Sequence, residues 1–332
     1  MTTTSREIHL VARPTGWPTH SDFRAVETTL PDPGPGEVLV RNTFLSVDPY
    51  MRGRMNDTKS YVEPFALDAP MDGGAVGEVV ASGDDAVRPG DTVLHQAGWR
   101  THALLPSRAV RTVDVSVVPA SAYLGVLGMP GLTAYVGLTR IAEVREGDTV
   151  FVSGAAGAVG SVAGQVARRL GAATVIGSAG SAEKTAWLTD ELGFDVALNY
   201  KDAPIGRQLR PHGPVDVYFD NVGGEHLEAA IGAMADFGRI AACGMIAAYN
   251  ADSPPPGPRN MMMVVSKRLT LRGFIVSDHG EAAPEFYRRA AGWVADGSLS
   301  WRETVVDGID NAVDAFLGLH RGENTGKMLV RL

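Results

Sequence analysis

A glycine- and alanine-rich stretch at residues 150–171, VFVSGAAGAVGSVAGQVARRLG, has the residue types that bind a phosphate group. Gly157 would let the backbone approach a pyrophosphate, and Gly160 would let the following helix pack closely on the preceding strand. The first glycine of the G-x-G-x-x-G pattern is Ala155 here, so the motif alone also fits a tight strand-to-helix turn. Because strand, loop, helix and next strand follow in order, we interpret the stretch as a dinucleotide site. The predicted contacts are Gly157, Ala158, Val159 and Gly160.

The end of the next predicted strand indicates which dinucleotide binds. An NADH site places an acidic residue about 20 residues after the loop, where it binds the ribose 2′-hydroxyl. The sequence here is ATVIGS followed by SAGSAEK, with Ser178 and Gly180 at the tip and Lys184 shortly after. A lysine on a helix is often only a surface residue, but a small neutral tip beside a cation suits a 2′-phosphate. We therefore predict NADPH, with Ser178 and Lys184 near the phosphate.

The sequence offers few ligands for a metal ion. Cys243 is the only cysteine, which excludes a four-cysteine zinc site. His95 and His102 have no accompanying set of ligands in the predicted β segment, and the run GGAVGEVV (residues 73–80) has no histidine. Scattered histidines are more often surface or core residues, so we predict no catalytic metal.

Composition limits the class of protein. The chain has 332 residues and a net charge of −8, from 30 basic and 38 acidic residues, which argues against nucleic-acid binding. One cysteine allows no internal disulfide and favours a reducing compartment. The sequence has no signal-peptide pattern and no apolar run long enough to span a membrane. We expect a cytoplasmic protein that contacts neither membrane nor nucleic acid.

The predicted elements change character along the chain. In the first third, short strands such as EVLVRNTFLSV (residues 37–47) alternate with Pro, Gly and Asp turns, which is typical of a small barrel or sandwich. Helical spacing follows near residue 120, broken at residues 128–131. From residue 149, strands and helices alternate, and Ser181 can cap one of the helices. This pattern predicts an α/β fold with a doubly wound parallel sheet, the Rossmann fold.

The end of the chain differs again. Residues 311–322 read as a helix that ends at Gly322, and KMLVRL (residues 327–332) reads as a final strand. We expect this tail to return to the first domain. The proline cluster SPPPGP (residues 253–258) can be neither a helix nor a central strand, so we expect a stiff surface loop.

Several motifs together resemble one family. They are VDPYMRGRM (residues 47–55), MPGLTAY (129–135), GAAGAVGSVAGQ (154–165), LNYK (198–201), FDNVGG (219–224), CGMIAAYN (243–250), RGFIVSDH (272–279) and GENTGKMLV (322–330). The chain resembles the zinc-independent branch of the medium-chain dehydrogenase/reductases, in particular the NADPH-dependent enone and alkenal double-bond reductases. The resemblance implies a GroES-like β domain made of residues 1–122 and 300–332, around a Rossmann domain at 123–299. It also implies a homodimer.

The resemblance further implies cofactor contacts. Lys184 and Tyr200 match groups around the 2′-phosphate, and Asn221 matches a contact after VYFDN. Two segments match the lining of the ribose and nicotinamide: Cys243, Gly244, Met245 and Ile246, then Phe274, Ile275 and Val276. Asn324 matches an asparagine that reaches the cofactor from the tail. Taken singly, Phe274 and Ile275 could be core residues and Asn221 a turn residue.

A metal-free enone reductase needs a hydrogen-bond donor for the negative charge that develops on the carbonyl oxygen. A tyrosine hydroxyl is suitable because it keeps its proton near pH 7. Tyr249 matches the family tyrosine near the nicotinamide, and Tyr50 one in the substrate cleft; Tyr61 is a weaker candidate. The cofactor ribose hydroxyl could serve in place of Tyr249. Residues 261–263, three methionines, could line an apolar pocket or pack in a core or interface.

Three functions follow, in order of preference. The first is NADPH-dependent reduction of the carbon–carbon double bond of α,β-unsaturated ketones or aldehydes. The second is NADPH-dependent quinone reduction, which would need no carbonyl donor. The third is a regulatory protein that binds NADPH without turnover.

Overall fold

The computed structural model describes residues 2–332 and divides into two units by internal contacts. The first, the β unit, runs up to Leu124 and resumes at Glu303–Leu332, and the second, the parallel-sheet unit, is Gly125–Arg302. The domain boundaries expected from the sequence, after residues 122 and 299, stay predictions of where independent folding domains begin.

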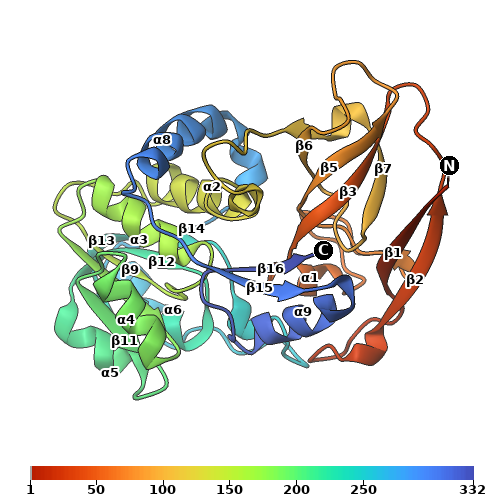
Figure 1. Ribbon diagram of the computed structural model, residues 1–332. Coiled ribbons are helices and arrows are strands. Elements are labelled where there is room, and N and C mark those ends of the chain that lie inside the picture. The colour runs from red at the N-terminus through yellow and green to blue at the C-terminus, as the bar shows by residue number, and fades with distance from the viewer. Residues whose placement is uncertain (1) are drawn as a thin grey trace. The chain divides into compact units, whose positions relative to one another are not determined.

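Strands dominate the β unit, as the short apolar runs and their turn residues predict. They are β1 (Thr3–Leu10), β2 (Phe23–Leu30), β3 (Glu37–Ser46), β4 (Ala69–Pro70), β5 (Ala75–Ser82), β6 (Thr92–His95), β7 (His102–Pro106), β8 (Arg111–Thr112), β15 (Glu303–Asp307) and β16 (Lys327–Arg331), with helices α1 (Met51–Arg54) and α9 (Ala312–His320) (Figure 1). One sheet has the order β2-β1-β4, and the other β15-β16-β3-β5-β6-β8, with β7 also paired to β3. The core of the β unit includes Leu45, Met51, Trp99 and Phe316, all fully buried.

The C-terminal tail belongs to this β unit. β16 pairs antiparallel with β3, so that Leu329 lies opposite Ser46, and parallel with β15. The chain end therefore completes a sheet that the N-terminal segment begins.

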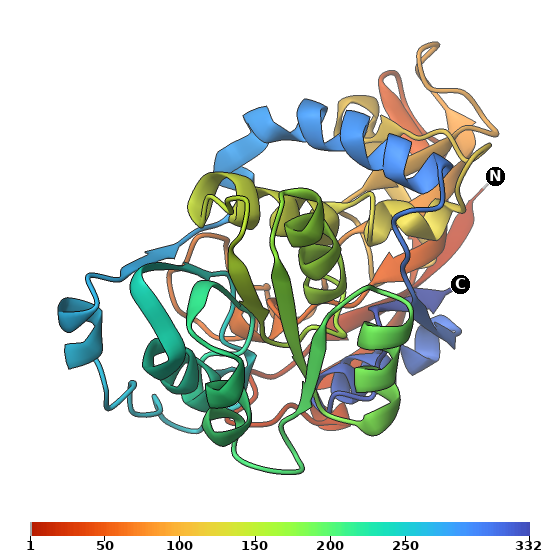
Figure 2. The same ribbon diagram turned by 90° about the vertical axis from the view of Figure 1, so that its left-hand side faces the viewer.

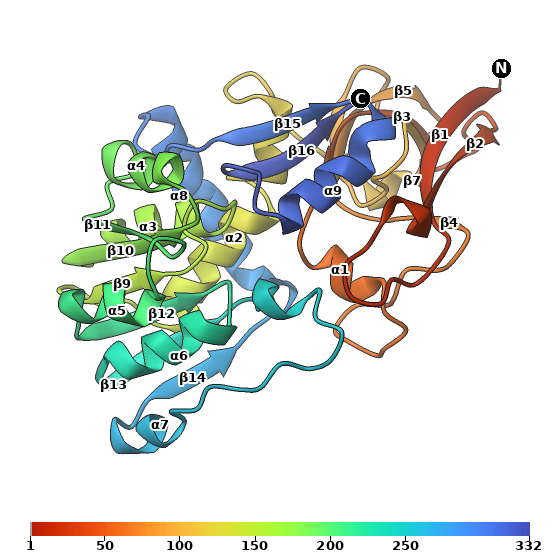
Figure 3. The same ribbon diagram turned by 90° about the horizontal axis from the view of Figure 1, so that it is seen from below.

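The parallel-sheet unit alternates strands and helices. Its strands are β9 (Thr149–Val152), β10 (Thr174–Ala179), β11 (Val196–Asn199), β12 (Val215–Asp220), β13 (Met234–Ala242) and β14 (Thr270–Gly273), and its helices are α2 (Met129–Val136), α3 (Gly160–Arg169), α4 (Ala182–Asp190), α5 (Ile205–Leu209), α6 (Gly224–Ala233), α7 (Met262–Ser266) and α8 (Ala283–Ala295). All neighbouring strands are parallel, in the order β11-β10-β9-β12-β13-β14 (Figure 3). This is the predicted Rossmann arrangement, and because its crossovers are right-handed, α3 and α4 lie on one face and α5 and α6 on the other. The predicted fold class is confirmed.

One predicted helix break is wrong in position. The break expected at residues 128–131 ends at Gly128, which is extended (φ −115°, ψ −156°), and α2 begins at Met129. Gly131 lies inside this helix, and a Cβ there would come within 2.0 Å of the Val126 carbonyl oxygen. Close packing, and not a break, therefore requires glycine at this position.

The proline cluster lies in an exposed segment before α7, as expected for a surface loop. Of the three methionines that follow, Met261 and Met262 are 48% and 77% exposed, whereas Met263 is half-buried and packs against the core of this unit. α7 and the edge strand β14 form the outer rim of this unit, drawn in light blue in Figure 2. None of the helices in residues 2–332 combines the length and apolar character that crossing a membrane requires.

Candidate active site

The carboxyl ends of the six parallel strands share one edge of the sheet, and most predicted cofactor residues lie along it. The loop 157–160 follows β9, Ser178 is on β10, Tyr200 follows β11, Asn221 follows β12, residues 243–246 follow β13, and residues 274–276 follow β14. β9 and β12 are neighbours although β10 and β11 separate them in sequence, so the strand order reverses between them (Figure 3). Open α/β sheets bind ligands in the crevice at such a reversal.

The glycine-rich loop after β9 depends on two glycines. Gly154 has φ +58°, a left-handed conformation that glycine adopts without strain. Its carbonyl oxygen accepts the N–H of Gly157 at 3.0 Å, and a Cβ on Gly160 would lie 2.4 Å from the same oxygen. Gly154 therefore permits the turn, one residue before Ala155, where the fingerprint pattern expects its first glycine.

The loop leads directly into α3. Val159 precedes the helix, Ala158 and Val159 are half-buried, and Gly160 is its first residue. The first N–H groups of a helix have no partner within it, so they can bind an anion at the loop. Ala155 is tied to the neighbouring strand, since its N–H donates to Ser178 O at 2.9 Å.

Tyr200 and Lys201 lie beside Gly180, just after β10, and Lys184 follows on α4. A Cβ on Gly180 would lie 2.6 Å from the Tyr200 hydroxyl and 3.3 Å from Lys201 Cε. Burial, followed by the charge of Lys201, lowers the pKa of Lys184. The Tyr200 hydroxyl and the Lys201 side chain therefore border a residue without a side chain, and the charge of Lys201 is close enough to act on Lys184, which suits a phosphate with two negative charges.

The helix that carries Lys184 begins as predicted. Ser181 precedes α4, and its side-chain oxygen accepts the N–H of Lys184 at 3.3 Å. Ser178 lies within β10, two residues before Gly180, and is fully buried. Its hydroxyl has no hydrogen-bond partner within residues 2–332. The predicted contact between Ser178 and a cofactor stays a prediction.

Asn221 lies against the start of the glycine-rich loop. Its side-chain amide donates to Ser153 O at 2.7 Å, and its backbone N–H donates to Ser153 Oγ at 3.0 Å. The Asn221 Cβ is 3.5 Å from where a Cβ on Gly154 would be. Asn221 therefore links the ends of β9 and β12, the two strands at the reversal.

A buried carboxylate supports this turn. Asp220 is fully buried, and one of its oxygens accepts the Tyr218 hydroxyl at 2.7 Å and the N–H groups of Gly223 and Val222 at 2.8 and 2.9 Å. Burial raises the pKa of Asp220 despite these donors. In the part of the chain that the structure describes, its other oxygen is buried without a partner.

The segment after β13 brings Tyr249 back over the turn before it. Cys243 and Gly244 donate their N–H groups to Asp220 O at 2.9 and 3.0 Å, and Ile246 lies on the short helical turn that follows. The Tyr249 hydroxyl oxygen accepts the Met245 N–H at 3.3 Å. This contact holds the Tyr249 hydroxyl at the turn that follows β13.

Cys243 is unsuited to act as a nucleophile. Burial and the nearby Asp220 raise the pKa of its thiol to about 12. A thiol that stays protonated near neutral pH is a poor nucleophile and a poor metal ligand.

The segment after β14 combines packing with a position on the sheet edge. The Phe274 ring packs edge-on against Phe219 at 6.3 Å, and a Cβ on Gly137 would lie 2.9 Å from it. Ile275 and Val276 are half-buried. Phe274 therefore has a packing role, and the predicted cofactor contacts of this segment stay predictions.

Tyr50 and Asn324 belong to the β unit. Tyr50 precedes α1, and burial, followed by the charge of Asp48, raises the pKa of its hydroxyl well above the ordinary value. Tyr50 therefore keeps its proton and can donate a hydrogen bond. Tyr61 is 59% exposed. Asn324 is buried in the loop before β16, where its amide donates to Gly326 O at 2.8 Å.

The histidines of the β unit have structural partners. The buried His95 contacts Asn42 Oδ1 through Nε2 at 2.9 Å and accepts the Ala97 N–H through Nδ1 at 3.1 Å, and burial lowers its pKa to about 4. His102 contacts Thr101 Oγ1 at 3.2 Å. Within residues 2–332, no three His, Cys, Asp or Glu side chains gather in the way that a metal ion requires.

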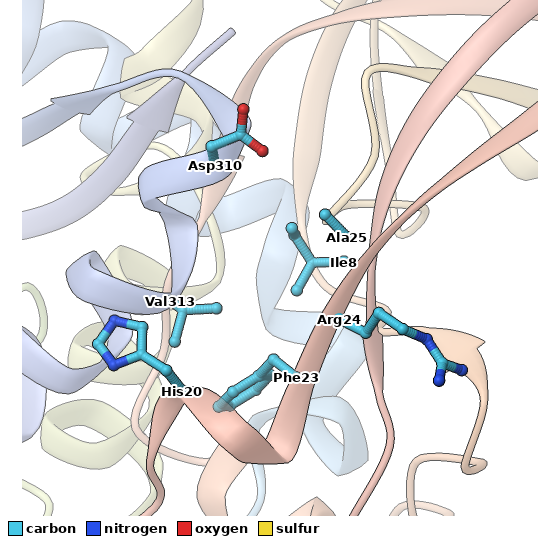
Figure 4. Close-up of a pocket in the computed structure, with 7 residues that line it drawn as sticks. All are labelled: Ile8, His20, Phe23, Arg24, Ala25, Asp310 and Val313. Atoms are coloured by element: carbon cyan, nitrogen blue, oxygen red, sulfur yellow. The ribbon is translucent and has the colours of Figure 1, made fainter.

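A small hollow of about 150 Å³ in the β unit lies between Ile8, Phe23 and Val313, with His20 and Asp310 at its rim (Figure 4). These polar groups are already paired, His20 with Asp314 and Asp310 with Arg6, each at 2.7 Å. The Arg24 guanidinium points away from the hollow (Figure 4). We assign it no ligand.

A larger groove of about 920 Å³ lies in the parallel-sheet unit. It begins at Tyr200 and Lys201 and extends to Arg259 and Asn260. Arg259 pairs with Glu228 at 2.8 Å, so its charge is largely compensated. The groove shares its cationic end with the predicted 2′-phosphate site.

The residues present fit NADPH. The loop at 154–160 carries no side chain larger than valine, and the Lys184–Tyr200–Lys201 group supplies positive charge after the second strand. Asn221 and the segment ending at Tyr249 continue the same edge beyond the reversal. These residues would hold, in turn, the pyrophosphate, the 2′-phosphate and the nicotinamide half.

Three features that contribute to this site were not predicted from the sequence. Lys201 was available in the motif LNYK, next to Tyr200, but only the structure brings it to Lys184. Gly154 was assigned no role, although a glycine directly after a buried strand is a turn signal. The support of Asn221 by Ser153 and Asp220 has no local sequence signal, because it joins β9 to β12.

Comparisons with known proteins agree with this arrangement. A family model described as the N-terminal domain of oxidoreductase matches residues 6–113, and one described as zinc-binding dehydrogenase matches residues 158–295. The chain is 40% identical to the NADPH-dependent curcumin reductase of Escherichia coli, over 97% of this chain and 95% of the relative. It is also 40% identical to the NADP(+)-dependent 2-alkenal reductase of Nicotiana tabacum, over 95% and 94% of the two chains.

A solved structure covers almost the whole chain. The crystal structure of CurA from Vibrio vulnificus in complex with NADPH is 42% identical, covers 98% of both chains and superposes with a TM-score of 0.93. This full-length likeness agrees with the resemblance seen in the sequence motifs. The chain therefore belongs to the medium-chain dehydrogenase/reductase superfamily, in the family of the NADP-dependent alkenal and curcumin reductases.

Proposed function

We propose that this chain uses NADPH to reduce the carbon–carbon double bond of α,β-unsaturated ketones and aldehydes. Full-length identity to relatives named for curcumin and alkenal reduction, over 95% or more of this chain, carries the proposal. The geometry supports it, since the glycine-rich loop and the Lys184–Tyr200–Lys201 group lie at the edge where a Rossmann sheet binds a dinucleotide.

The chain's own residues bind and orient the cofactor. The N–H groups at the start of α3 bind the pyrophosphate, and Lys184 and Lys201 neutralise the 2′-phosphate. Asn221, held by Ser153, sets the position of the nicotinamide half. Bound NADPH would supply the hydride that reaches the β-carbon of the substrate.

A protein hydroxyl stabilises the charge that develops on the substrate carbonyl oxygen. Tyr249 is the first candidate, because its hydroxyl lies at the turn after β13, where the Met245 N–H orients it. Tyr50 is the second candidate, kept protonated by burial and by Asp48. Removing one donor of this kind from a preorganised site costs about 10²–10³ in turnover.

Purified protein, NADPH and a panel of enones, alkenals and quinones test the function. We expect NADPH oxidation with enones and alkenals, and product analysis should show a saturated carbon–carbon bond with the carbonyl intact. Turnover of quinones alone would favour quinone reduction. Tight NADPH binding with no turnover on any substrate would favour a regulatory role.

Variants then separate the two donors. We expect Tyr249→Phe to lower enone turnover about 100-fold without weakening NADPH binding, because the ring and its packing remain. Tyr287→Phe, on α8, removes a hydroxyl from another element of the same unit and serves as the matched control. Unchanged turnover in Tyr249→Phe would transfer the role to Tyr50 or to the ribose hydroxyl.

We also propose that two copies pair through β14. All residues of this edge strand are exposed, and the neighbouring β13 and the preceding α7 expose Phe237, Met262 and Val265 at 66%, 77% and 71%. An unpaired edge can pair with its own copy across a two-fold axis. Light scattering should give a dimer that Val265→Lys converts to a monomer, and a monomeric unaltered protein would contradict this. The cytoplasmic location stays a prediction.

A further inference from the structure

A lysine near the end of the chain is buried beside the segment that carries Tyr50. Lys327, the first residue of β16, is 3% exposed. Its ammonium donates to Val47 O at 2.7 Å and Met328 O at 2.8 Å, and it lies 3.2 Å from Asp48 Oδ1. An ammonium has three N–H donors, so these three acceptors satisfy it completely.

Asp48 receives contacts from both directions along the chain. Its other side-chain oxygen accepts the hydroxyl of Ser46, the last residue of β3. Its backbone carbonyl accepts the N–H of Met51 at 3.2 Å, at the start of α1. Asp48 therefore connects the end of a core strand to the helix that follows Tyr50.

The ladder between β16 and β3 ends where this ion pair begins. Leu329 lies opposite Ser46, and one further bond joins Val47 N–H to Met328 O at 3.2 Å. Beyond that point, the chain that leaves β3 is held by the contacts of Lys327 with Val47 and Asp48. Glu303 is opposite Lys327 in the β15–β16 register and supplies a second nearby carboxylate.

The Tyr50 segment needs such a support. α1 has four residues, and a single helical turn is not stable on its own. Its far side is held by the buried Arg52, which donates to Gly16 O at 2.8 Å and Asn56 Oδ1 at 2.8 Å. Its near side is held by Asp48 and Lys327.

We propose that Lys327 is a positioning residue for Tyr50, acting through Asp48 from the last strand of the chain. The inference rests on the proposed function, in which Tyr50 is the second candidate for the hydroxyl donor. A buried ion pair is often no more stabilising than apolar residues of the same volume, so stability alone does not explain it. Fixing the direction in which the chain leaves β3 does explain it.

A double-mutant cycle tests the proposal in the full-length protein. Lys327→Met is measured with and without Tyr50→Phe, for enone kcat and KM and for NADPH affinity. We expect Lys327→Met to lower kcat about tenfold in the presence of Tyr50, because small displacements of an oriented group cost this much. In the Tyr50→Phe background the same change should cost less than about twofold, with NADPH affinity unchanged throughout.

A second variant allows for loss of folding. Lys327→Met leaves Asp48 buried without its partner, whereas Lys327→Met with Asp48→Asn removes both charges and should fold. Lys267→Met is the matched control, since Lys267 Nζ donates to Gly232 O and Met234 O at 2.8 and 2.7 Å in the other unit. The control should leave enone turnover unchanged.

Each other outcome is decisive. An equal loss of kcat in both backgrounds would mean general loosening and would overturn the proposal, as would no loss in either. Wild-type turnover by Tyr50→Phe would also overturn it, while enone reduction by the unaltered protein would preserve the proposed function. If the unaltered protein reduces no enone, the proposed function is wrong, and this inference is wrong with it because it depends on that function.

Discussion

The glycine-rich loop of the parallel-sheet unit and the Tyr50 turn of the β unit are positioned by different means. The loop is shaped by the backbone, through the positive φ of Gly154 and the contact of Gly160 with its carbonyl. The Tyr50 turn is held by buried side-chain charges, Lys327 with Asp48, and Arg52 with backbone carbonyls. An anion-binding loop must leave its N–H groups exposed to the ligand, so side chains are excluded from it. A turn that presents one side chain can use others as its support.

Adding one methyl group to the glycine-rich loop should have the largest effect. Gly160→Ala places a Cβ 2.4 Å from Gly154 O and 2.7 Å from Ala155 Cα, and backbone cannot yield as a side chain can. We expect the free energy of unfolding to fall by about 3 kcal/mol, together with a loss of NADPH affinity. Urea denaturation and fluorescence titration measure the two effects.

Gly292→Ala provides the control for this substitution. A Cβ on Gly292, in α8, would meet nothing within 4 Å. Alanine should therefore stabilise the helix by about 0.8–1.0 kcal/mol and leave NADPH binding unchanged. If Gly160→Ala binds NADPH as tightly as the unaltered protein, backbone contacts do not shape the loop for NADPH binding.

The next largest effect concerns pH and touches both units. His95 in the β unit and His226 in the parallel-sheet unit are buried, and burial lowers the pKa of each to about 4. Between about pH 6.5 and pH 4, these histidines are protonated in the unfolded chain but not in the folded chain. The free energy of unfolding therefore falls as pH falls through this window. Each histidine should cost about 2–3 kcal/mol by pH 4.

Single variants assign this pH dependence. His226→Phe retains a ring against Tyr200, from which the His226 ring lies 5.2 Å away, and removes the titration. The free energy of unfolding should then vary less between pH 6.5 and pH 4 than in the unaltered protein. A slope identical to that of the unaltered protein would mean that the His226 ring is already protonated or solvated when folded.

The third prediction concerns the positive charges at the parallel-sheet edge. Lys184→Ala and Lys201→Ala should each weaken NADPH binding by about 10- to 100-fold, because each removes a charge-assisted contact. NADH lacks the 2′-phosphate, so its binding should change little and serves as the internal control. Equal weakening of both nucleotides would place the lysines elsewhere than at the 2′-phosphate.

The smallest effect is that of the helix cap beside this site. Ser181→Ala removes the acceptor for the Lys184 N–H and should cost about 1 kcal/mol of stability. Ser253→Ala, in the exposed proline loop, is the matched change without a cap and should have no measurable effect. Equal stabilities of the two variants would show that α4 does not depend on its cap.

The local patterns of the chain predicted a large part of this molecule. The alternation of strands and helices from residue 149, the loop at 154–160, the cap at Ser181 and the final strand all follow from residues close in sequence. Such features can be read because turns, caps and periodicity depend on neighbouring residues. The absence of an acidic residue just after β10 is also a local feature, and it indicated NADPH.

Contacts between distant segments were decided only by the tertiary structure. Lys201 approaches Lys184 because β10 and β11 are adjacent in the sheet, and Asn221 meets Ser153 because β12 lies beside β9. Lys327 and Val47 are 280 residues apart in sequence, and no local pattern joins them. A sequence states which side chains are available, but the packing of strands decides which of them meet, since pairing between remote segments depends on the whole core.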